Sequence, residues 1–150
     1  MTNRKLLFVC LGNICRSPLA EGIAKAKIEK LNLQIIVDSA GTSSWHEGSP
    51  PCLNSILIAK KYGIDISKQK SRPVKKDDFI NFDMIFALDN NNLDDLKRMG
   101  AKNVKLLGDF GFNGADIPDP YHYKNLEGFE KVFNMIDVCI DDLLKSFHDD

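Results

Sequence analysis

A short, almost wholly apolar run near the amino terminus, Lys5–Cys10, constrains the fold more than any other part of the chain. Such a run is typical of a β-strand buried on both faces, as strands are in a parallel sheet. The loop after it ends at Ser17-Pro18, a good pair for the start of a helix, and apolar residues then recur at helical spacing as far as Leu31. The sequence therefore predicts a strand, a loop and a helix in direct succession.

The same alternation continues along the rest of the chain. Further strands are predicted at 34–38, 83–88 and 104–107, and further helices at 52–62, 75–82, 91–99 and 129–147. Strands that alternate with helices imply right-handed crossovers and a doubly wound α/β sandwich, in which ligands bind beyond the carboxyl ends of the strands. The segment 108–123 is predicted to be a long irregular loop, and such loops are often functional.

The composition is that of an ordinary globular protein. With 150 residues, of which 43% are hydrophobic and 27% charged, one domain over residues 1–150 is expected. The net charge of −1 offers no general attraction for nucleic acid or an anionic membrane, and no stretch approaches the ~20 apolar residues of a membrane span. Four cysteines without zinc-like spacing predict neither a disulfide scaffold nor a metal site, so a cytoplasmic location is expected.

The loop from Cys10 to Ser17 has the residues of an anion site. Amides at a helix N-terminus favour an anion, and Gly12 is expected to take a positive φ that lets the loop curl. Arg16 can bind two phosphate oxygens through its planar guanidinium. Cys10 would then lie on the floor of the loop as a thiolate nucleophile, with the Ser17 hydroxyl near its sulfur.

The plainer interpretation makes Cys10 a small core residue and Arg16 a surface cation. The joint pattern of Cys, five residues, Arg and Ser between a strand and a helix favours the phosphate site. A nucleophile at phosphorus also needs an acid for the leaving oxygen. Asp119 is the candidate because Pro120 restricts its backbone to an extended conformation on the 108–123 loop, although a solvated turn aspartate is the plainer alternative.

Several segments resemble one known family. VCLGNICRSP near the amino terminus and DPY at 119–121 closely resemble the low molecular weight protein tyrosine phosphatases, and the resemblance extends through DSAGTSSW at 38–45, FDMIFALDNNNL at 82–93 and the terminal helix. It implies a three-layer α/β sandwich with a four-stranded parallel sheet flanked by helices on both faces. It also implies hydrolysis of phosphotyrosine through a phosphocysteine intermediate, with no metal and no cofactor.

The resemblance also implies roles by position. Cys10 matches the nucleophile, Arg16 the group that binds the phosphoryl oxygens, and Asp119 the general acid that later acts as base. The residues that match the phosphate-binding loop are Leu11, Gly12, Asn13, Ile14, Cys15 and Ser17, of which Asn13 and Ser17 match residues that hold the loop and the thiolate. The slot for the aromatic ring would be walled by Leu11, Ile14, Trp45 and Tyr121, and Asp89 would orient Arg16.

Two positions depart from the family pattern. Many members have a histidine that contacts the loop asparagine, and Gln69 stands at that position here; its amide can keep the hydrogen bond but cannot carry charge. The usual Asp-Pro-Arg after the tryptophan segment is replaced by Pro51-Cys52-Leu53, so no surface role is carried over to that stretch.

Three other functions occur with the same loop. Arsenate reductases resemble this chain but need a later cysteine pair, and no cysteine lies between Cys52 and Cys139. Protein arginine phosphatases also resemble it but place Thr where Ile14 stands. An inactive phosphate-binding module could lose the nucleophile or the acid, both of which are present. The expected partners are a phosphotyrosine-containing protein and a phosphate or other oxyanion in the loop, and the chain is expected to be mostly monomeric.

Cys15 stands five residues after the nucleophile. Curling of the loop can bring the two α-carbons within the ~4.4 to 6.8 Å that a disulfide requires. Cys15 is therefore expected to resolve a sulfenic acid that peroxide forms on Cys10. The alternative is that Cys15 merely packs beneath the loop.

Overall fold

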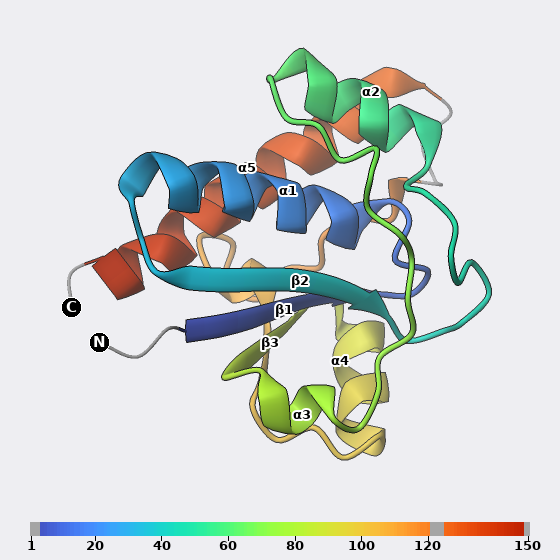
Figure 1. The fold of residues 1–150 in the computed structure, drawn as a ribbon, viewed down its shortest axis with the longest axis vertical. Coiled ribbons are helices and arrows are strands. Elements are labelled where there is room, and N and C mark those ends of the chain that lie inside the picture. Colours follow the sequence, from blue (N-terminus) through green and yellow to red (C-terminus); the bar gives the residue numbers. More distant parts are fainter. Residues whose placement is uncertain (1–3, 121–124, 149–150) are drawn as a thin grey trace.

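The computed structural model describes residues 4–120 and 125–148, and it is built on a four-stranded sheet. Figure 1 shows this sheet with helices on either side. The strands are β1 (Arg4–Cys10), β2 (Ile35–Gly41), β3 (Met84–Ala87) and β4 (Val104–Leu106). Their order is β2-β1-β3-β4, and all three neighbouring pairs are parallel. The parallel four-stranded sheet is therefore confirmed.

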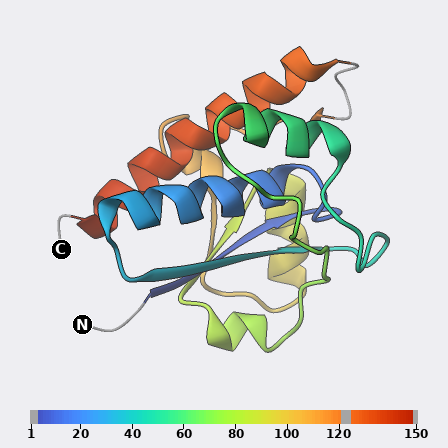
Figure 2. The same cartoon turned by 45° about the horizontal axis from the view of Figure 1, so that its top comes forward.

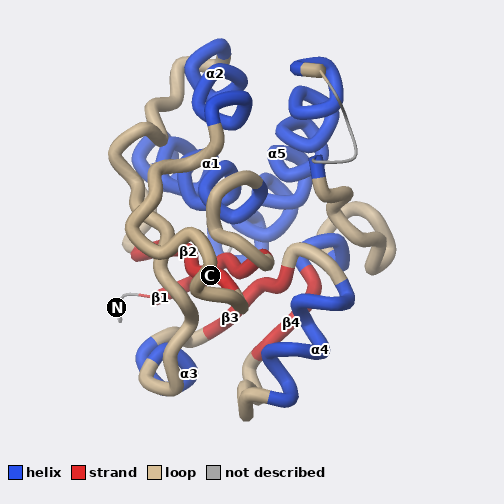
Figure 3. Tube along the Cα trace, turned by 90° about the vertical axis from the view of Figure 1, so that its right-hand side faces the viewer, coloured by secondary structure: helices blue, strands red, loops and turns tan. Residues whose placement is uncertain are grey.

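Helices cover both faces of this sheet, and one short 3-10 turn, η1 (Leu107–Asp109), follows the last strand. On one face lie α1 (Arg16–Leu31), α2 (Leu53–Lys61) and α5 (Leu126–His148), and on the other lie α3 (Asp78–Asn81) and α4 (Asn90–Arg98) (Figures 1 and 3). This arrangement confirms the three-layer sandwich.

The side chains of β1 alternate between the two hydrophobic layers. Leu6, Phe8 and Cys10 belong to the core beneath α1 and α5, whereas Leu7 and Val9 belong to the core beneath α4. Since successive strand residues point to opposite faces, an all-apolar strand supplies both cores at once. Each fully buried apolar side chain of this size contributes ~1.5–3 kcal/mol, so β1 is fixed firmly and Cys10 is fixed at its end.

The long helix α5 carries the stripe of apolar residues that its sequence predicts. Phe129, Phe133, Ile136, Ile140 and Leu143 are all buried. Figure 2 shows α5 running beside α1, against which this stripe packs. Among the helices of the described residues, none is long and apolar enough to cross a membrane.

Three elements have a bound that differs by three residues from the one expected: β2, α3 and α5, which begins at Leu126 rather than at residue 129. β2 extends to Gly41, three residues beyond the predicted strand, because Ser39, Ala40 and Gly41 pair with the last three residues of β1. The Gly41 backbone also bonds to Arg72 (2.9 Å) and Val74 (2.8 Å) of a segment distant in sequence. Helix α3 is shorter than the predicted 75–82, because the Asp78 carboxylate accepts the Lys75 N–H at 2.8 Å and holds the residues before the helix in a turn.

Candidate active site

The loop between β1 and α1 lies at the carboxyl edge of the sheet, where the fold predicts a ligand site. Its carbonyl groups are bonded to protein groups outside the loop. The donors are Ser43 N–H to the Leu11 carbonyl (3.0 Å), Ser71 Oγ to Gly12 (2.9 Å), Cys52 N–H to Ile14 (2.7 Å) and Ser55 Oγ to Cys15 (3.2 Å). In a trans peptide the N–H points opposite to the C=O, so the following amides turn toward the concave side of the loop.

Asn13, rather than Gly12, has the left-handed backbone that curls the loop. The φ of Asn13 is 55°, and Gly12 is not among the residues with positive φ, so the expectation for Gly12 is wrong. Three hydrogen bonds hold the Asn13 side chain in place and stabilise this conformation: its Nδ2 donates to Ser17 Oγ (2.7 Å) and Ser39 Oγ (2.9 Å), and its Oδ1 accepts the Arg72 N–H (3.0 Å). Gly12 has a different reason to lack a side chain, because a Cβ there would lie 3.1 Å from the His46 ring.

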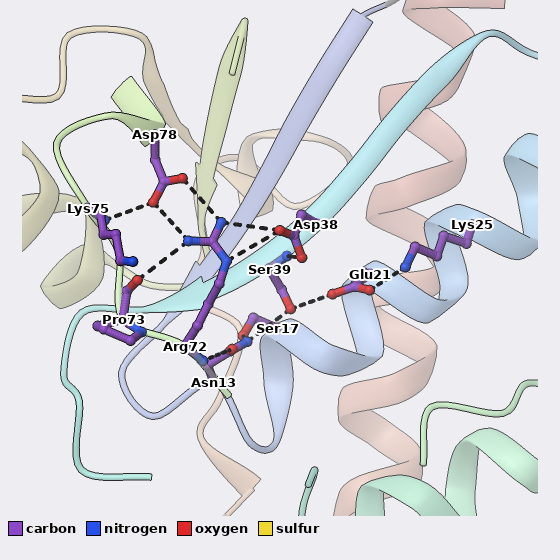
Figure 4. A network of polar contacts seen from close by, with 10 residues as sticks. All are labelled: Asn13, Ser17, Glu21, Lys25, Asp38, Ser39, Arg72, Pro73, Lys75 and Asp78. Carbon is purple, nitrogen blue, oxygen red and sulfur yellow. Dashed lines mark hydrogen bonds and ion pairs between the residues drawn. The ribbon is translucent and has the colours of Figure 1, made fainter. Parts of the chain in front are cut away.

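A directed chain of hydrogen bonds ends at the sulfur of Cys10, to which the Ser17 hydroxyl is hydrogen-bonded. Figure 4 shows the part of this chain that links Glu21, Ser39, Asn13 and Ser17. At the other end, the Glu21 carboxylate can only accept, so Ser39 donates its hydroxyl proton to it at 2.6 Å. The Asn13 amide donates to both serine oxygens, which leaves the Ser17 proton free to donate to the Cys10 sulfur 3.1 Å away. The Asn13 N–H donates to the same sulfur at 3.3 Å. Two donors therefore converge on the Cys10 sulfur.

A charged cluster anchors the outer side of this network. Figure 4 shows the Arg72 guanidinium between two carboxylates, 3.0 Å from Asp78 and 3.2 Å from Asp38. These ion pairs hold the segment whose backbone N–H binds Asn13. Arg72, Ser39 and Glu21 were not among the predicted site residues. Ser39 lies within the DSAGTSSW segment, but no sequence pattern marks the other two.

Arg16 is the buried cation of the site, with 4% of its surface exposed. Its Nη1 donates to Asp89 Oδ2 at 2.7 Å and to the Ile117 carbonyl at 2.9 Å. Burial lowers the pKa of Arg16, but the Cys10 sulfur and Asp89 outweigh burial, and the pKa is raised above its ordinary value. The guanidinium is therefore a buried charge in contact with Asp89 and the Ile117 carbonyl.

One cavity brings most of the predicted site residues together. It is lined by Cys10, Leu11, Gly12, Ile14, Cys15, Arg16, Trp45, His46 and Asp119. Trp45 is 77% exposed and stands at the rim, as does the segment that carries Asp119. Tyr121 lies outside the described residues. Among residues 4–120 and 125–148, no three His, Cys, Asp or Glu side chains group together as a metal ion would require.

Gln69 does not contact the loop asparagine, contrary to expectation. Its Nε2 donates to the Pro18 carbonyl at 3.1 Å, in the first turn of α1, and its Oε1 is buried without a hydrogen-bond partner among the described residues. The backbone of Arg72, three residues later, supplies the bond to Asn13 instead.

Cys15 contacts another cysteine of the chain. Its Sγ lies 2.7 Å from the Sγ of Cys52, the residue just before α2, and both thiols are free. Disulfide formation between Cys15 and Cys10 stays a prediction, because this structure holds both in the reduced form.

Comparisons with known proteins agree with one another. The profile of the low molecular weight phosphotyrosine protein phosphatase family matches residues 5–150. The low molecular weight protein-tyrosine-phosphatase YfkJ of Bacillus subtilis is 41% identical over 149 residues, which cover 94% of each chain. The crystal structure of YfkJ matches with a TM-score of 0.91, 36% identity and coverage of 99% of this chain and 97% of that one.

A second solved structure is similar to the same extent. The crystal structure described as a Drosophila arginine phosphatase matches with a TM-score of 0.89 and 35% identity, covering 95% of this chain and 97% of that one. The family profile and the identity to its members over nearly the full length decide the assignment. The chain belongs to the low molecular weight phosphotyrosine protein phosphatase family.

Proposed function

We propose that this protein hydrolyses phosphotyrosine in proteins, without a metal ion, through a phosphocysteine intermediate on Cys10. The observation that carries the proposal is the position of Cys10, a residue only 3% exposed, whose sulfur lies within hydrogen-bonding distance of Ser17 and Asn13 of the loop. Arg16 lines the same cavity. A nucleophile, inward-turned amides and a fixed cation thus meet at one point, as phosphoryl transfer requires.

In the first step the loop amides and Arg16 bind the phosphate oxygens. The Cys10 thiolate attacks phosphorus, the S–P bond forms, and the bond from phosphorus to the phenolic oxygen breaks. Asp119, on the rim of the same cavity, donates its proton to that oxygen, so the phenol leaves neutral.

In the second step water releases the phosphate. Asp119, now a carboxylate, accepts a proton from water as its oxygen attacks phosphorus, and the S–P bond breaks. The electron pair returns to Cys10, where the Ser17 hydroxyl stabilises the thiolate. The cycle consumes one water and yields phenol and inorganic phosphate, and the proton that Asp119 takes from that water restores its acid form.

The walls of the cavity favour a flat aromatic leaving group. Leu11 and Ile14 line it with apolar surface, and Trp45 stands at its rim. A phenol ring fills such a slot while its phosphate reaches the floor, whereas the shorter side chain of phosphoserine does not.

Replacing the two reacting side chains separates binding from chemistry. Cys10→Ser is expected to abolish hydrolysis of p-nitrophenyl phosphate while vanadate still binds, because a hydroxyl lacks thiolate character and the amides and Arg16 remain. Asp119→Asn should lower kcat by about 10²- to 10⁴-fold, the usual contribution of a positioned acid. Both are measured by steady-state kinetics with a chelator present and by calorimetric titration with vanadate.

A neighbouring aspartate provides the control. Asp116 accepts hydrogen bonds from the Asn90 backbone and side chain, both at 2.8 Å, and an amide oxygen can keep them. Asp116→Asn should therefore leave kcat within a few-fold of the parent. Appreciable turnover by Cys10→Ser would contradict the mechanism.

Phosphoarginine is the second candidate substrate, because a similar solved structure is described as an arginine phosphatase. The side chain of Ile14 should make the enzyme prefer phosphotyrosine. An apolar residue at this position leaves a guanidinium unpaired, which costs ~1–3 kcal/mol, so kcat/KM for phosphotyrosine should exceed that for phosphoarginine by about 5- to 150-fold or more.

Ile14→Thr should lower the ratio of kcat/KM for phosphotyrosine to kcat/KM for phosphoarginine. Ile14→Val, which has the shape of threonine without the hydroxyl, should not lower it. Equal kcat/KM values for the two substrates in the parent enzyme would make the arginine phosphatase the better description.

Asp89 is expected to position Arg16 and also to stabilise helix α4, through separate oxygens. Its Oδ2 accepts from Arg16, and its Oδ1 accepts the Asn92 N–H at 2.8 Å as the helix cap. Asp89→Asn keeps a good cap but loses the charge facing Arg16. It should lower kcat/KM by about 10- to 100-fold, the equivalent of a hydrogen bond to a charged group, with little change in urea stability.

Asp89→Ala should lose a similar factor in activity and, in addition, about 1 kcal/mol of unfolding free energy from the missing cap. If Asp89→Asn is fully active, Arg16 does not need this partner.

A further inference from the structure

A second pair of reactive groups lies beside the phosphate loop. The sulfur atoms of Cys15 and Cys52 are 2.7 Å apart although the residues are 37 positions apart in sequence. Their backbones are tied together as well, because the Cys52 N–H donates to the Ile14 carbonyl at 2.7 Å and Ser55 Oγ donates to the Cys15 carbonyl at 3.2 Å. The two thiols therefore face each other in a fixed arrangement.

The surroundings make the two thiols unequal. Cys52 precedes the first residue of α2, where the helix dipole favours a negative charge. The hydrogen bond from the Cys15 thiol lowers the pKa of Cys52, and contacts with Ser55 lower it further against the opposing effect of burial. The same bond raises the pKa of Cys15, which burial raises further. Cys52 is therefore the more acidic thiol of the pair.

The two thiols also differ in their exposure to solvent. Cys15 is buried against Ile14 and Phe129, whereas Cys52 is partly exposed at the edge of that cluster. An oxidant from solvent therefore reaches Cys52 before it reaches Cys15. The Cys15 sulfur already contacts the Cys52 sulfur, so it can react with Cys52 once that residue is oxidised.

We propose that Cys15 and Cys52 form a redox-active dithiol that reacts with small hydroperoxides, and that its oxidised form is a Cys15–Cys52 disulfide which leaves Cys10 as a free thiol. This site goes beyond the proposed hydrolysis and does not require that Cys10 turn over phosphate. The partner of Cys15 is then Cys52, whereas the sequence alone suggests Cys10.

The chemistry proceeds in two balanced steps. The Cys52 thiolate attacks the terminal oxygen of the hydroperoxide, the O–O bond breaks, and the alkoxide takes a proton from solvent, which leaves a sulfenic acid on Cys52. The Cys15 sulfur then attacks the Cys52 sulfur, and the hydroxyl group departs with the Cys15 proton as water. Two thiols lose two electrons, and one hydroperoxide is reduced to an alcohol and water.

Tryptic digestion separates the possible products. Cleavage after Lys5 and Arg16 places Cys10 and Cys15 together on peptide 6–16, and cleavage after Lys30 and Lys60 places Cys52 on peptide 31–60. The parent protein is treated with hydrogen peroxide in saturating inorganic phosphate, alkylated, digested without reductant and analysed by mass spectrometry. The expected product links the two peptides, and Cys10 becomes alkylated once phosphate is removed.

Variants assign the cross-link to its two sulfurs. In Cys10→Ser/Cys139→Ser only Cys15 and Cys52 remain, and the same cross-link should form. Cys15→Ser and Cys52→Ser should each abolish it. Cys139→Ser is the matched control, since that thiol is buried in the separate core beneath α1 and α5, and it should cross-link like the parent. Because the pKa of Cys52 is lowered, the reaction should be faster at pH 7.5 than at pH 5.

Two results would overturn the proposal. One is a parent protein, oxidised in saturating phosphate, in which peptide 6–16 has lost two hydrogens by itself, since that product is a Cys10–Cys15 disulfide. The other is a Cys10→Ser/Cys139→Ser protein whose two remaining cysteines advance to sulfinic acid without any cross-link. Loss of phosphatase activity in Cys10→Ser bears only on the hydrolysis mechanism, so the two proposals fail separately.

Discussion

The phosphate site depends on hydrogen bonds that draw the carbonyl groups of one short loop away from its centre. Four donors from three separate segments, Ser43, Ser71 and the Cys52–Ser55 stretch, bind the carbonyls of Leu11, Gly12, Ile14 and Cys15. Since each peptide unit is rigid and trans, fixing the carbonyl outward fixes the next N–H inward. The loop therefore presents positive dipoles to an anion before any anion arrives, and no reorganisation is needed at the moment of reaction.

A second constraint sets the direction of every proton around the Cys10 sulfur. Glu21 is a buried carboxylate in a salt bridge with Lys25, and it obliges Ser39 to donate toward it. The Asn13 amide donates to the Ser17 oxygen, so the Ser17 hydroxyl proton is available to donate to the Cys10 sulfur. Removing a partner from such a buried chain costs more than one average hydrogen bond, because the groups left behind stay unsatisfied. The fold thus holds the sulfur in an environment that suits a negative charge.

Much of this could be predicted from the sequence, for physical reasons that also explain the errors. An apolar run such as Lys5–Cys10 is typical of a strand buried on both faces, as in a parallel sheet, and the motif around Cys10 and Arg16 lies between this strand and a helix. Contacts between distant segments leave no such local pattern. The left-handed residue proved to be Asn13 because Ser17, Ser39 and Arg72 hold its side chain, and the contact expected from Gln69 comes from the Arg72 backbone. The contact between the thiols of Cys15 and Cys52 also joins segments distant in sequence, so no local pattern predicts it.

The central claim is that the loop turns Cys10 into the group that receives phosphate from the substrate. Its most direct test is to mix enzyme with p-nitrophenyl phosphate, stop the reaction with denaturant within one turnover, and locate the phosphate by mass spectrometry of peptide 6–16. The account predicts one phosphoryl group per active enzyme, bound to the sulfur of Cys10 and lost as turnover is completed. Phosphate attached to any other residue, or a complete turnover during which the enzyme carries no phosphate, would contradict it.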